Sequence, residues 1–351
     1  MSTKPRGRRV WRLGVVVAVM GVAVTVAATA GQANRSQDSY TLGLSNTLVG
    51  NGWREGQLCA FKAQALASGK VDSLKIAHRA TDTAGQISDI RAMISSGVDA
   101  IIINPSSPTA LKPVAAQALA RGIKIVFIDQ YVNAPGAYNA TNDQVGYARL
   151  GAAWLFKKIG GRGNVVELRG IAGVPADTDR HKGFRQALKA FPNIKVVKSV
   201  FTGWQFAPAG QAMLDILNSG TDVDGVWTSG TDYTVVDAFK TAGKPYAPVV
   251  GADNYGFVRQ LKSLSPKFQG AAVTNPSSIG GVGVTQAIRV LDKKAVPKWI
   301  KLTPDIWTWP QDRASINKYA VRGAPADASA QLQLPPWTTY TLKQYRACKG
   351  P

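Results

Sequence analysis

Cysteine and histidine are almost absent from this sequence, since only 2 of each occur in 351 residues. Zinc sites of the Cys/His type and iron–sulfur clusters need three or four such ligands, so the composition argues against both. Two cysteines also rule out a framework of several disulfides. We therefore expect no metal site and no cofactor in this protein.

Acidic residues are also scarce, because 21 Asp+Glu stand against 42 Lys+Arg and give a formal net charge of +21. The basic residues are dispersed along the chain, without basic runs or interleaved aromatics, so no nucleic acid is expected as a partner. Acidic envelope polymers, anionic lipid headgroups or an anionic ligand fit this charge better.

Long apolar runs are lacking except for one near the N-terminus. Five basic residues precede that run, and it ends in the small residues Ala28-Thr29-Ala30, with Ala33 as another cleavage point. This order is typical of an export signal, which we assign to residues 1–33; a retained membrane anchor is the alternative. No cysteine lies near the exit for lipid attachment, so we expect an exported protein in the periplasm or another extracytoplasmic part of the cell envelope.

Hydrophobic residues make up 45% of the chain, enough for a folded core, and the length suggests two domains. From Thr41 onward, short apolar runs alternate with amphipathic stretches, and the same alternation begins again at Asp143. Continuous apolar strands between helices are typical of parallel sheets covered on both faces. The sequence therefore predicts an α/β fold built from two βα halves of similar size.

The expected elements follow from these patterns. The strands are 41–45, 74–78, 100–104, 124–129, 164–168, 195–201, 225–228, 248–251 and 271–274. The helices are 54–67, 85–96, 109–121, 143–159, 180–191, 208–218, 232–242, 255–264 and 279–291.

Polar residues stand at the exits of four apolar strands: Asn104, Asp129, Asp232 and Asp253. Asp and Asn at such positions commonly cap the following helix. Four of them at one edge of the sheets, with aromatics nearby, also suit a cleft for a polyhydroxylated ligand, because carboxylates and amides pair with adjacent hydroxyls while aromatic faces cover C–H groups.

Several segments resemble the type I periplasmic sugar-binding proteins that deliver ligands to ABC importers, with the ribose- and galactofuranose-binding members most similar. The resemblance runs from about Thr41 to Leu291. Its segments are Gly97-Val-Asp-Ala-Ile-Ile-Ile-Asn-Pro, Arg121-Gly-Ile-Lys-Ile-Val-Phe-Ile-Asp, Asn164-Val-Val-Glu-Leu-Arg-Gly, Asp179-Arg-His-Lys-Gly-Phe, Val249-Val-Gly-Ala-Asp and Ile279-Gly-Gly-Val-Gly-Val.

This resemblance implies two Rossmann-like lobes with parallel sheets, joined by a hinge of three crossover strands. The first lobe would comprise 38–142 plus 273–302, and the second lobe with the C-terminal tail 143–272 plus 303–351. Ligand would lie between the lobes and be buried by hinge closure.

The resemblance also implies ligand-binding residues, of which Asp129, Asn104, Arg180 and Asp253 match sugar-contacting positions. The full set is Trp53, Arg54, Asn104, Asp129, Arg180, Trp204, Thr231, Asp253, Thr274 and Asn275.

Three departures from the family pattern bear on the ligand: Gln130 stands where an Arg is frequent, Thr231 replaces an Asn, and Thr274 or Asn275 replaces a Gln. A pentose other than ribose, a polyol or a modified sugar is therefore as plausible as ribose or galactofuranose, and an acidic sugar stays open.

Two cysteines far apart in an exported protein favour a disulfide between Cys59 and Cys348, and we expect the tail 301–351 to wrap back to the first lobe. A buried free Cys59 and an unpaired Cys348 are the alternative.

Together with the export signal, this resemblance implies an exported, monomeric solute-binding protein, not an enzyme, that delivers a sugar or polyol to an ABC permease in the membrane. A sugar sensor that presents its ligand to a membrane receptor is the first alternative. A glycoside-acting enzyme is the second, since Asp129 and Asp253 could serve as its two carboxyl groups. With only His78 and His181 present, we expect no Ser/His/Asp or Cys/His constellation.

Overall fold

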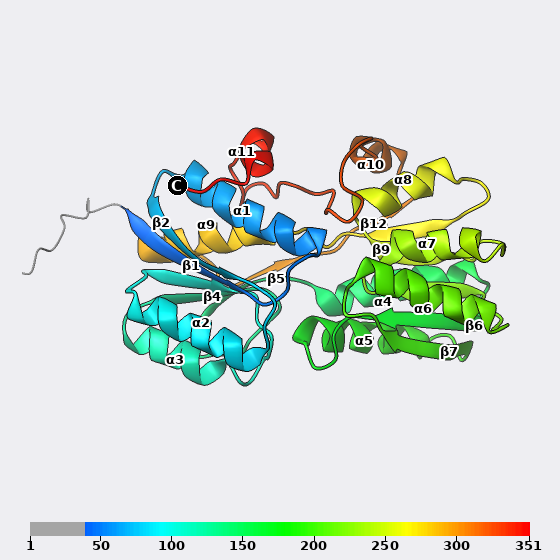
Figure 1. Ribbon diagram of the computed structural model, residues 1–351, viewed down its shortest axis with the longest axis horizontal. Helices are drawn as coiled ribbons and strands as arrows, with labels where there is room; N and C mark the ends of the chain where they lie inside the picture. Colours follow the sequence, from blue (N-terminus) through cyan, green and yellow to red (C-terminus); the bar gives the residue numbers. More distant parts are fainter. Residues whose placement is uncertain (1–38) are drawn as a thin grey trace, which may run out of the picture. The chain divides into compact units, whose positions relative to one another are not determined.

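The computed structural model describes residues 39–351, and the predicted export signal at 1–33 lies outside them. Within the described part, two six-stranded sheets each carry helices on both faces, and we call these two units the first and second lobe (Figure 1). No helix between residues 39 and 351 is long and apolar enough to cross a lipid bilayer.

The first lobe contains a sheet in which every neighbouring pair of strands is parallel. In spatial order its strands are β11 (Trp299–Leu302), β5 (Tyr138–Asn142), β4 (Lys124–Asp129), β3 (Ala100–Ile103), β1 (Tyr40–Asn46) and β2 (Val71–His78). Its helices are α1 (Gly52–Ser68), α2 (Thr83–Ser95), α3 (Lys112–Ala120) and α9 (Ile279–Leu291).

The second lobe repeats this arrangement, but its edge strand β12 runs antiparallel to β10. In spatial order its strands are β12 (Ile306–Thr308), β10 (Gly270–Val273), β9 (Val249–Ala252), β8 (Gly225–Thr228), β6 (Arg162–Arg169) and β7 (Asn193–Phe201). Its helices are α4 (Gln144–Lys158), α5 (Pro175–Leu188), α6 (Phe206–Asn218), α7 (Asp232–Thr241), α8 (Tyr255–Ser263) and α10 (Arg313–Tyr319).

The continuous apolar runs of the central strands reflect burial on both faces of each sheet. On β3, Ile102 packs into the core beneath α1 and α9, while Ile101 and Ile103 pack into the core beneath α2 and α3. On β8 the same alternation puts Val226 and Trp227 into two different cores. Because successive side chains of a strand point to opposite faces, a strand buried on both sides needs an apolar residue at every position.

Before its C-terminal tail, the chain passes between the two lobes three times. It leaves the first sheet after β5, returns from β10 into α9, and crosses again between β11 and β12 (Figure 1). This confirms the predicted α/β fold of two lobes, with the correction that the second sheet is not wholly parallel. The boundaries assigned to two separately moving domains stay a prediction.

Several predicted elements differ from the structure in extent. Helix α5 begins at Pro175, five residues before the predicted start at Arg180, and proline suits this first helical position because its missing N–H needs no partner there. Strands β5, β11 and β12 were not among the predicted elements, nor were α10 and the terminal helix α11 (Leu342–Ala347). These elements have only three to seven residues, too few for a clear periodicity.

The C-terminal tail ends on the first lobe, where α11 packs against α1 (Figure 1). Cys348 is bonded to Cys59 of α1, with a Cα–Cα distance of 4.5 Å, so the predicted disulfide is confirmed. The bridge spans 289 residues of sequence, and a loop of this size restricts the unfolded chain by about 5 kcal/mol on the loop-entropy model.

Candidate functional site

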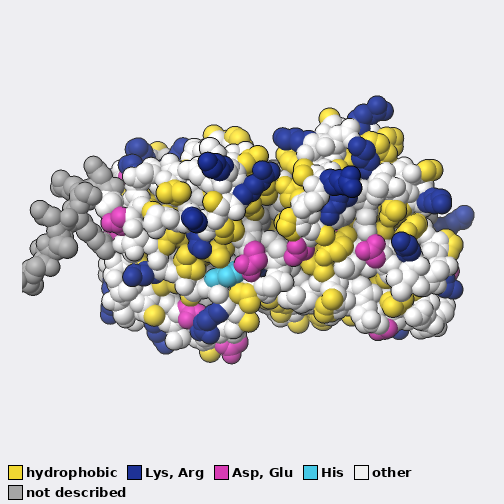
Figure 2. Space-filling model, turned by 45° about the horizontal axis from the view of Figure 1, so that its top comes forward, with side chains coloured by type: hydrophobic (Ala, Val, Ile, Leu, Met, Phe, Trp, Pro, Cys, Tyr) yellow, Lys and Arg dark blue, Asp and Glu magenta, His cyan; other side chains and the backbone are white. Residues whose placement is uncertain are grey.

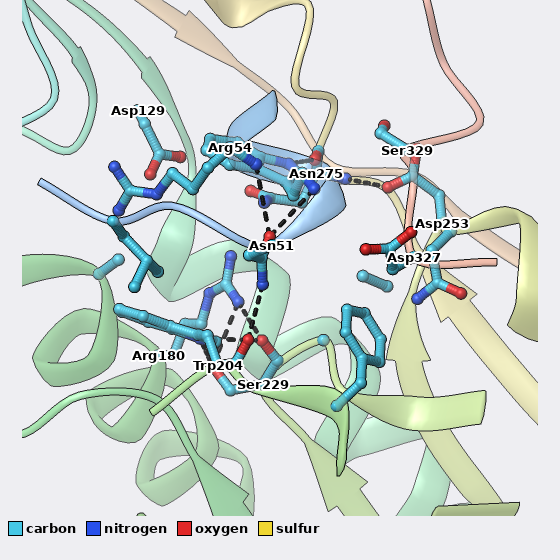
Figure 3. Close-up of a pocket in the computed structure, with 17 residues that line it drawn as sticks. Asn51, Arg54, Asp129, Arg180, Trp204, Ser229, Asp253, Asn275, Asp327 and Ser329 are labelled. Atoms are coloured by element: carbon cyan, nitrogen blue, oxygen red, sulfur yellow. Dashed lines mark hydrogen bonds between the residues drawn. The ribbon is translucent and has the colours of Figure 1, made fainter. Parts of the chain in front are cut away.

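A cavity of about 60 Å³ lies where the two lobes meet, and 17 residues of the described chain line it (Figure 3). Seven of the ten ligand-binding residues predicted from the sequence are among them: Trp53, Arg54, Asp129, Arg180, Trp204, Asp253 and Asn275. Asp129 lies on one side of the cavity, and Asp253, Asp327 and Ser329 lie on the other (Figure 3). The fold therefore brings together residues that are up to 281 positions apart in the sequence, from Leu48 to Ser329.

The first turn of α1 supplies two of these residues. Asn51 is the N-cap of this helix, and its side-chain oxygen accepts hydrogen bonds from the backbone nitrogens of Trp53 and Arg54. The cap fixes the direction in which the helix starts, so that both side chains face the cavity. The indole nitrogen of Trp53 donates to the backbone oxygen of Asn275, which sets the angle of its ring.

Arg54 is a buried cation, only 6% exposed. Its Nη1 donates to Asn46 Oδ1 at 2.7 Å. Burial lowers the pKa of Arg54 to about 10, with Arg180 nearby adding to the decrease and Asp129 opposing it. The guanidinium stays charged at neutral pH and, within residues 39–351, makes no other hydrogen bond, so most of its donors are available to a ligand.

Asp129 has an unusual backbone conformation, with φ at +67° at the end of β4. Asp tolerates this left-handed region better than most residues, and such positions are enriched where a side chain must be held in one direction. Asn142 and Gln144 both donate to Asp129 Oδ1, at 2.9 and 2.7 Å. The carboxylate is thus fixed from one side, and its other oxygen is left to accept from a ligand.

Arg180, on α5 in the second lobe, is held by three groups. Its guanidinium lies over the ring of Tyr147, with 4.3 Å from Cζ to the ring centroid. Its Nε donates to Gln144 Oε1 at 2.7 Å, and its Nη1 donates to the backbone oxygen of Ser229 at 2.6 Å. Within residues 39–351 the Nη2 atom of Arg180 has no hydrogen-bond partner, so this nitrogen can donate to a ligand.

Asp253 follows β9 and is 1% exposed. Its Oδ1 accepts from the backbone nitrogen of Asn275 at 2.8 Å, and its Oδ2 is buried without a hydrogen-bond partner in the described chain. Burial raises the pKa of Asp253 to about 6, and the hydrogen bond from Asn275 opposes part of that rise. A buried acceptor without a partner is costly, so a ligand hydroxyl would relieve it.

Aromatic rings form the apolar part of the cavity: Trp53 from the first lobe, and Trp204 and Phe206 from the second. Trp204 also has a positive φ, at +56°. Its indole nitrogen donates to Ser229 Oγ at 3.0 Å, which orients the ring. These flat faces suit the C–H groups of a sugar or polyol.

Asn104, Thr231 and Thr274, which the sequence also predicted as ligand-binding, lie outside the lining of the cavity. Asn104 is fully buried, and its amide group is bonded to Gln57 and Gln130. Thr274 is bonded to Asp305 through both its hydroxyl and its backbone nitrogen. Thr231 is buried beside α7, and its hydroxyl has no partner among the described residues.

Asp232, the fourth strand exit, has a structural role. Its carboxyl group accepts from the backbone nitrogen of Ala252 and from the side chain of Asn254, and it does not line the cavity. It therefore fixes the turn that carries Asp253. Burial raises the pKa of Asp232 to about 7, against the effect of these hydrogen bonds.

Some lining residues were missed by the sequence interpretation. Asn51, Ser229 and Phe206 stand in predicted loops or at helix starts, and Asp327 and Ser329 belong to the tail. Asn51 carried a detectable signal, since Asn is favoured as an N-cap and this residue stands three positions before the predicted helix 54–67. Asp327 and Ser329 in the tail carried no such signal, because the family resemblance ends near Leu291 and no periodic pattern assigns these residues to a helix or strand.

The charges of the cavity balance closely: two guanidinium groups, from Arg54 and Arg180, face three carboxyl groups, from Asp129, Asp253 and Asp327. Lys and Arg side chains are scattered over the molecular face of Figure 2 and form no single patch there. Between residues 39 and 351, no group of three or more His, Cys, Asp or Glu side chains could hold a metal ion. Paired donors and acceptors beside aromatic faces can bind a molecule with several hydroxyl groups.

Several known proteins are similar to this chain in sequence. A family model described as a periplasmic binding protein domain matches residues 42–295. The galactofuranose-binding protein of Escherichia coli is 26% identical over 304 residues, which cover 84% of this chain and 93% of that protein. The xylitol-binding protein of Mycolicibacterium smegmatis is 30% identical over 228 residues, or 64% of each chain.

A solved structure shows the same architecture. The ABC transporter solute-binding protein from Thermobispora bispora superposes with a TM-score of 0.76 at 28% sequence identity, and the match covers 88% of this chain and 94% of that one.

Proposed function

Because this chain belongs to the periplasmic binding protein family, we propose that it is an exported solute-binding protein that captures one small polyhydroxy molecule between its lobes. The cavity carries this proposal: residues of both lobes line it, and one of them, Asp253, has a buried carboxyl oxygen without a hydrogen-bond partner in the described chain. Two relatives are named for binding galactofuranose and xylitol, which are neutral polyhydroxy compounds. The ligand proposed here is a neutral sugar or polyol.

The balance of charge supports a neutral ligand over an acidic one. The carboxylate of a sugar acid would add a fourth negative group to a buried cavity that already contains Asp129, Asp253 and Asp327. Two guanidinium groups would offset only part of this charge, and burying an unbalanced charge is costly. Hydroxyl groups can instead accept from Arg54 and Arg180 and donate to the carboxylates.

Binding would shift the population between open and closed forms. Asn51 of the first lobe donates to the backbone oxygen of Trp204 in the second lobe, and the backbone nitrogen of Ala176 in the second lobe donates to Gln130 in the first. These bonds require the lobes to be together, while a ligand has to enter when they are apart. A ligand that contacts both lobes favours the closed form by its additional contacts there.

The bound molecule would be delivered to an ABC permease in the membrane, with the protein acting as a monomer. Deletion of the gene that encodes this chain should then abolish uptake of the radiolabelled ligand, and reintroducing the gene should restore uptake. In the alternative role of a membrane sensor, uptake would be unchanged and the transcriptional response to the ligand would be lost.

A thermal-shift screen tests the binding function. Xylitol, D-ribose, L-arabinose and D-galactose serve as neutral candidates, and D-galacturonate serves as the acidic comparison. At 100 times its Kd, a ligand stabilises the folded state by about 2.7 kcal/mol, which is easily detected. We expect stabilisation by at least one neutral compound, none by galacturonate, and loss of the effect in Asp129→Ala and Arg180→Ala.

Asp222→Ala, which removes an exposed carboxylate of the second lobe, is the matched control and should respond as the wild type does. A response that survives in both Asp129→Ala and Arg180→Ala would contradict this site.

A further inference from the structure

The C-terminal tail, residues 321–351, is held by both lobes. Its first part is attached to α8 of the second lobe. Arg259 Nη1 donates to the backbone oxygens of Val321 and Ala324, and the backbone nitrogen of Gly256 donates to the backbone oxygen of Ala326. Residues 326–330 and 253–256 continue this attachment through backbone hydrogen bonds, with an antiparallel bridge between Asn254 and Ser329, which resembles the pairing of an added strand. This part of the tail therefore moves with the second lobe.

The last part of the tail is attached to the first lobe. Tyr340 and Tyr345 pack with Ala60 and Ala63 of α1 in a small apolar core, and Cys348 is bonded to Cys59. The side chain of Gln64 makes two hydrogen bonds to Thr339, at 2.8 and 3.0 Å. The tail is thus a fourth connection between the lobes, in addition to the three crossings, and the disulfide joins its end covalently to the first lobe.

Asp327 lies within the first of these attachments, between Ala326 and Ala328, and lines the cavity. Its Oδ2 accepts a hydrogen bond of 2.8 Å from the backbone nitrogen of Gly52, in the first turn of α1. A Cβ atom at position 52 would lie 2.5 Å from Asp327 Cγ, so the close approach depends on glycine. A carboxylate suits this position because the first N–H groups of a helix lack partners and the helix dipole favours negative charge.

We propose that the tail is a strap that stabilises the closed form, and that Asp327 is its latch on the first turn of α1. The argument rests on the proposed function, since it assumes that the lobes separate. Asp327 follows a segment fixed to the second lobe and Gly52 belongs to the first lobe, so their bond is present when the lobes are together and is broken when they part. Asp327 is a positioning residue in this role: it holds the turn from which Trp53 and Arg54 reach the cavity.

Amide hydrogen exchange at the start of α1 measures the latch without any ligand. In the ligand-free protein, Asp327→Ala removes the acceptor of the Gly52 N–H, and we expect exchange at residues 51–55 to become about 10-fold faster. Asp327→Asn retains an acceptor oxygen and should give a smaller increase. Unchanged exchange in Asp327→Ala would overturn the proposal.

Asp312→Ala is the matched control. Asp312 precedes α10 in the second lobe, and its carboxylate also accepts from a backbone nitrogen, that of Thr308, but it does so away from the cavity. We expect it to leave exchange at residues 51–55 unchanged. An equal acceleration in this control would show a general loosening of the protein and would also overturn the latch.

The covalent anchor is tested by the double variant Cys59→Ser/Cys348→Ser. We expect exchange at residues 51–55 to increase several-fold, and the added effect of Asp327→Ala to be smaller than in the wild type, because the two changes weaken the same connection. If Asp327→Ala accelerates exchange at residues 51–55 by the same factor with and without the disulfide, the strap is contradicted. If the double variant does not fold, the comparison of Asp327→Ala with Asp312→Ala still decides the latch.

These measurements stay separate from the proposed function. If no compound in the thermal-shift screen binds, the ligand class is wrong, while the exchange results still report on the latch. If a ligand binds and exchange at residues 51–55 is insensitive to Asp327, the strap is wrong and the binding function stands.

Discussion

Asn51 in the first lobe donates a hydrogen bond of 2.6 Å from its side-chain amide to the backbone oxygen of Trp204 in the second lobe. The carbonyl oxygen of the same side chain caps helix α1. One residue therefore serves both the helix that carries Trp53 and Arg54 and the contact between the lobes. A substitution can remove the donor to Trp204 and keep the oxygen that caps α1. The contribution of this contact to the closed form can therefore be measured separately from the cap.

Asn51→Asp keeps the oxygen that caps α1 and replaces the donor to Trp204 by a second oxygen. We expect the unfolding temperature of the ligand-free protein to change little, and the ligand Kd to rise about 10-fold or more because two oxygens now face each other in the closed form. Calorimetric titration with a compound found in the screen measures the change. Asn51→Ser, which also retains a cap but adds no charge, is the control; unchanged affinity in both variants would contradict the bridge.

Gln144 joins the two charged groups at the end of the cavity, since its amide nitrogen donates to Asp129 and its oxygen accepts from Arg180. It does not line the cavity itself. Gln144→Leu preserves its size and leaves both groups without this partner. We expect a ligand Kd about 10- to 100-fold higher, together with a loss of about 1–3 kcal/mol in the free energy of unfolding.

A double-variant comparison shows whether Gln144 acts through Asp129. Asp129→Ala should weaken binding less in the Gln144→Leu background than in the wild type, because the carboxylate is no longer held there. Equal effects in both backgrounds would mean that Gln144 has only a structural role.

Asp253 predicts a dependence of stability on pH in the ligand-free protein. Its pKa rises from 3.8 to about 6 on folding because of burial. The folded state then binds more protons than the unfolded state between about pH 4 and 6, so this contribution to stability is complete below pH 4 and is lost as the pH rises through 6. Two units of pKa correspond to roughly 3 kcal/mol.

Denaturant unfolding between pH 4 and pH 8 measures this contribution. Asp253→Asn should decrease less in stability over this range than the wild type. Asp232, whose pKa burial raises to about 7, should contribute most of the remaining slope, since burial raises the pKa of Asp179 and Asp237 as well. A wild-type protein whose stability increases from pH 4 to pH 6 would contradict the burial of an uncompensated carboxyl group.

A substitution at Gly283 tests how closely α9 packs on the sheet of the first lobe. A Cβ atom at this position would lie 2.5 Å from Ile128 Cγ2, so Gly283→Ala should lower the free energy of unfolding by about 1–3 kcal/mol through overpacking. Ligand affinity should stay near the wild-type value, because Gly283 does not line the cavity. A variant as stable as the wild type would mean that the helix shifts at little cost.

The architecture could be predicted from the sequence because both faces of each sheet are buried, which makes the strands continuously apolar. Runs such as 100–103 and 124–129 can be read as parallel strands from their composition alone, and the helices between them have regular periods. Short crossing strands such as β11, which has four residues, contain too few positions for a period to be recognised. The early start of α5 at Pro175 was detectable, since proline favours the first helical position.

The candidate site was only partly predictable for a different reason. Asp129 and Asp253 lie at strand exits, where the topology alone brings side chains together. Asn104 occupies the same kind of position, yet Gln57 and Gln130 bind its amide, and no local pattern in a sequence tells which of two exits turns outward. Asp327 reaches the cavity through the path of the tail, a long-range arrangement that leaves no local signal.

Calorimetric titration of the exported protein with neutral and acidic sugars and polyols tests the central claim most directly. We predict saturable binding of one neutral polyhydroxy molecule per chain, absent in the double variant Asp129→Ala/Arg180→Ala, which removes one contact from each lobe. Binding of an acidic sugar alone, or unchanged binding of a neutral compound in the double variant, would contradict a ligand held between the two lobes.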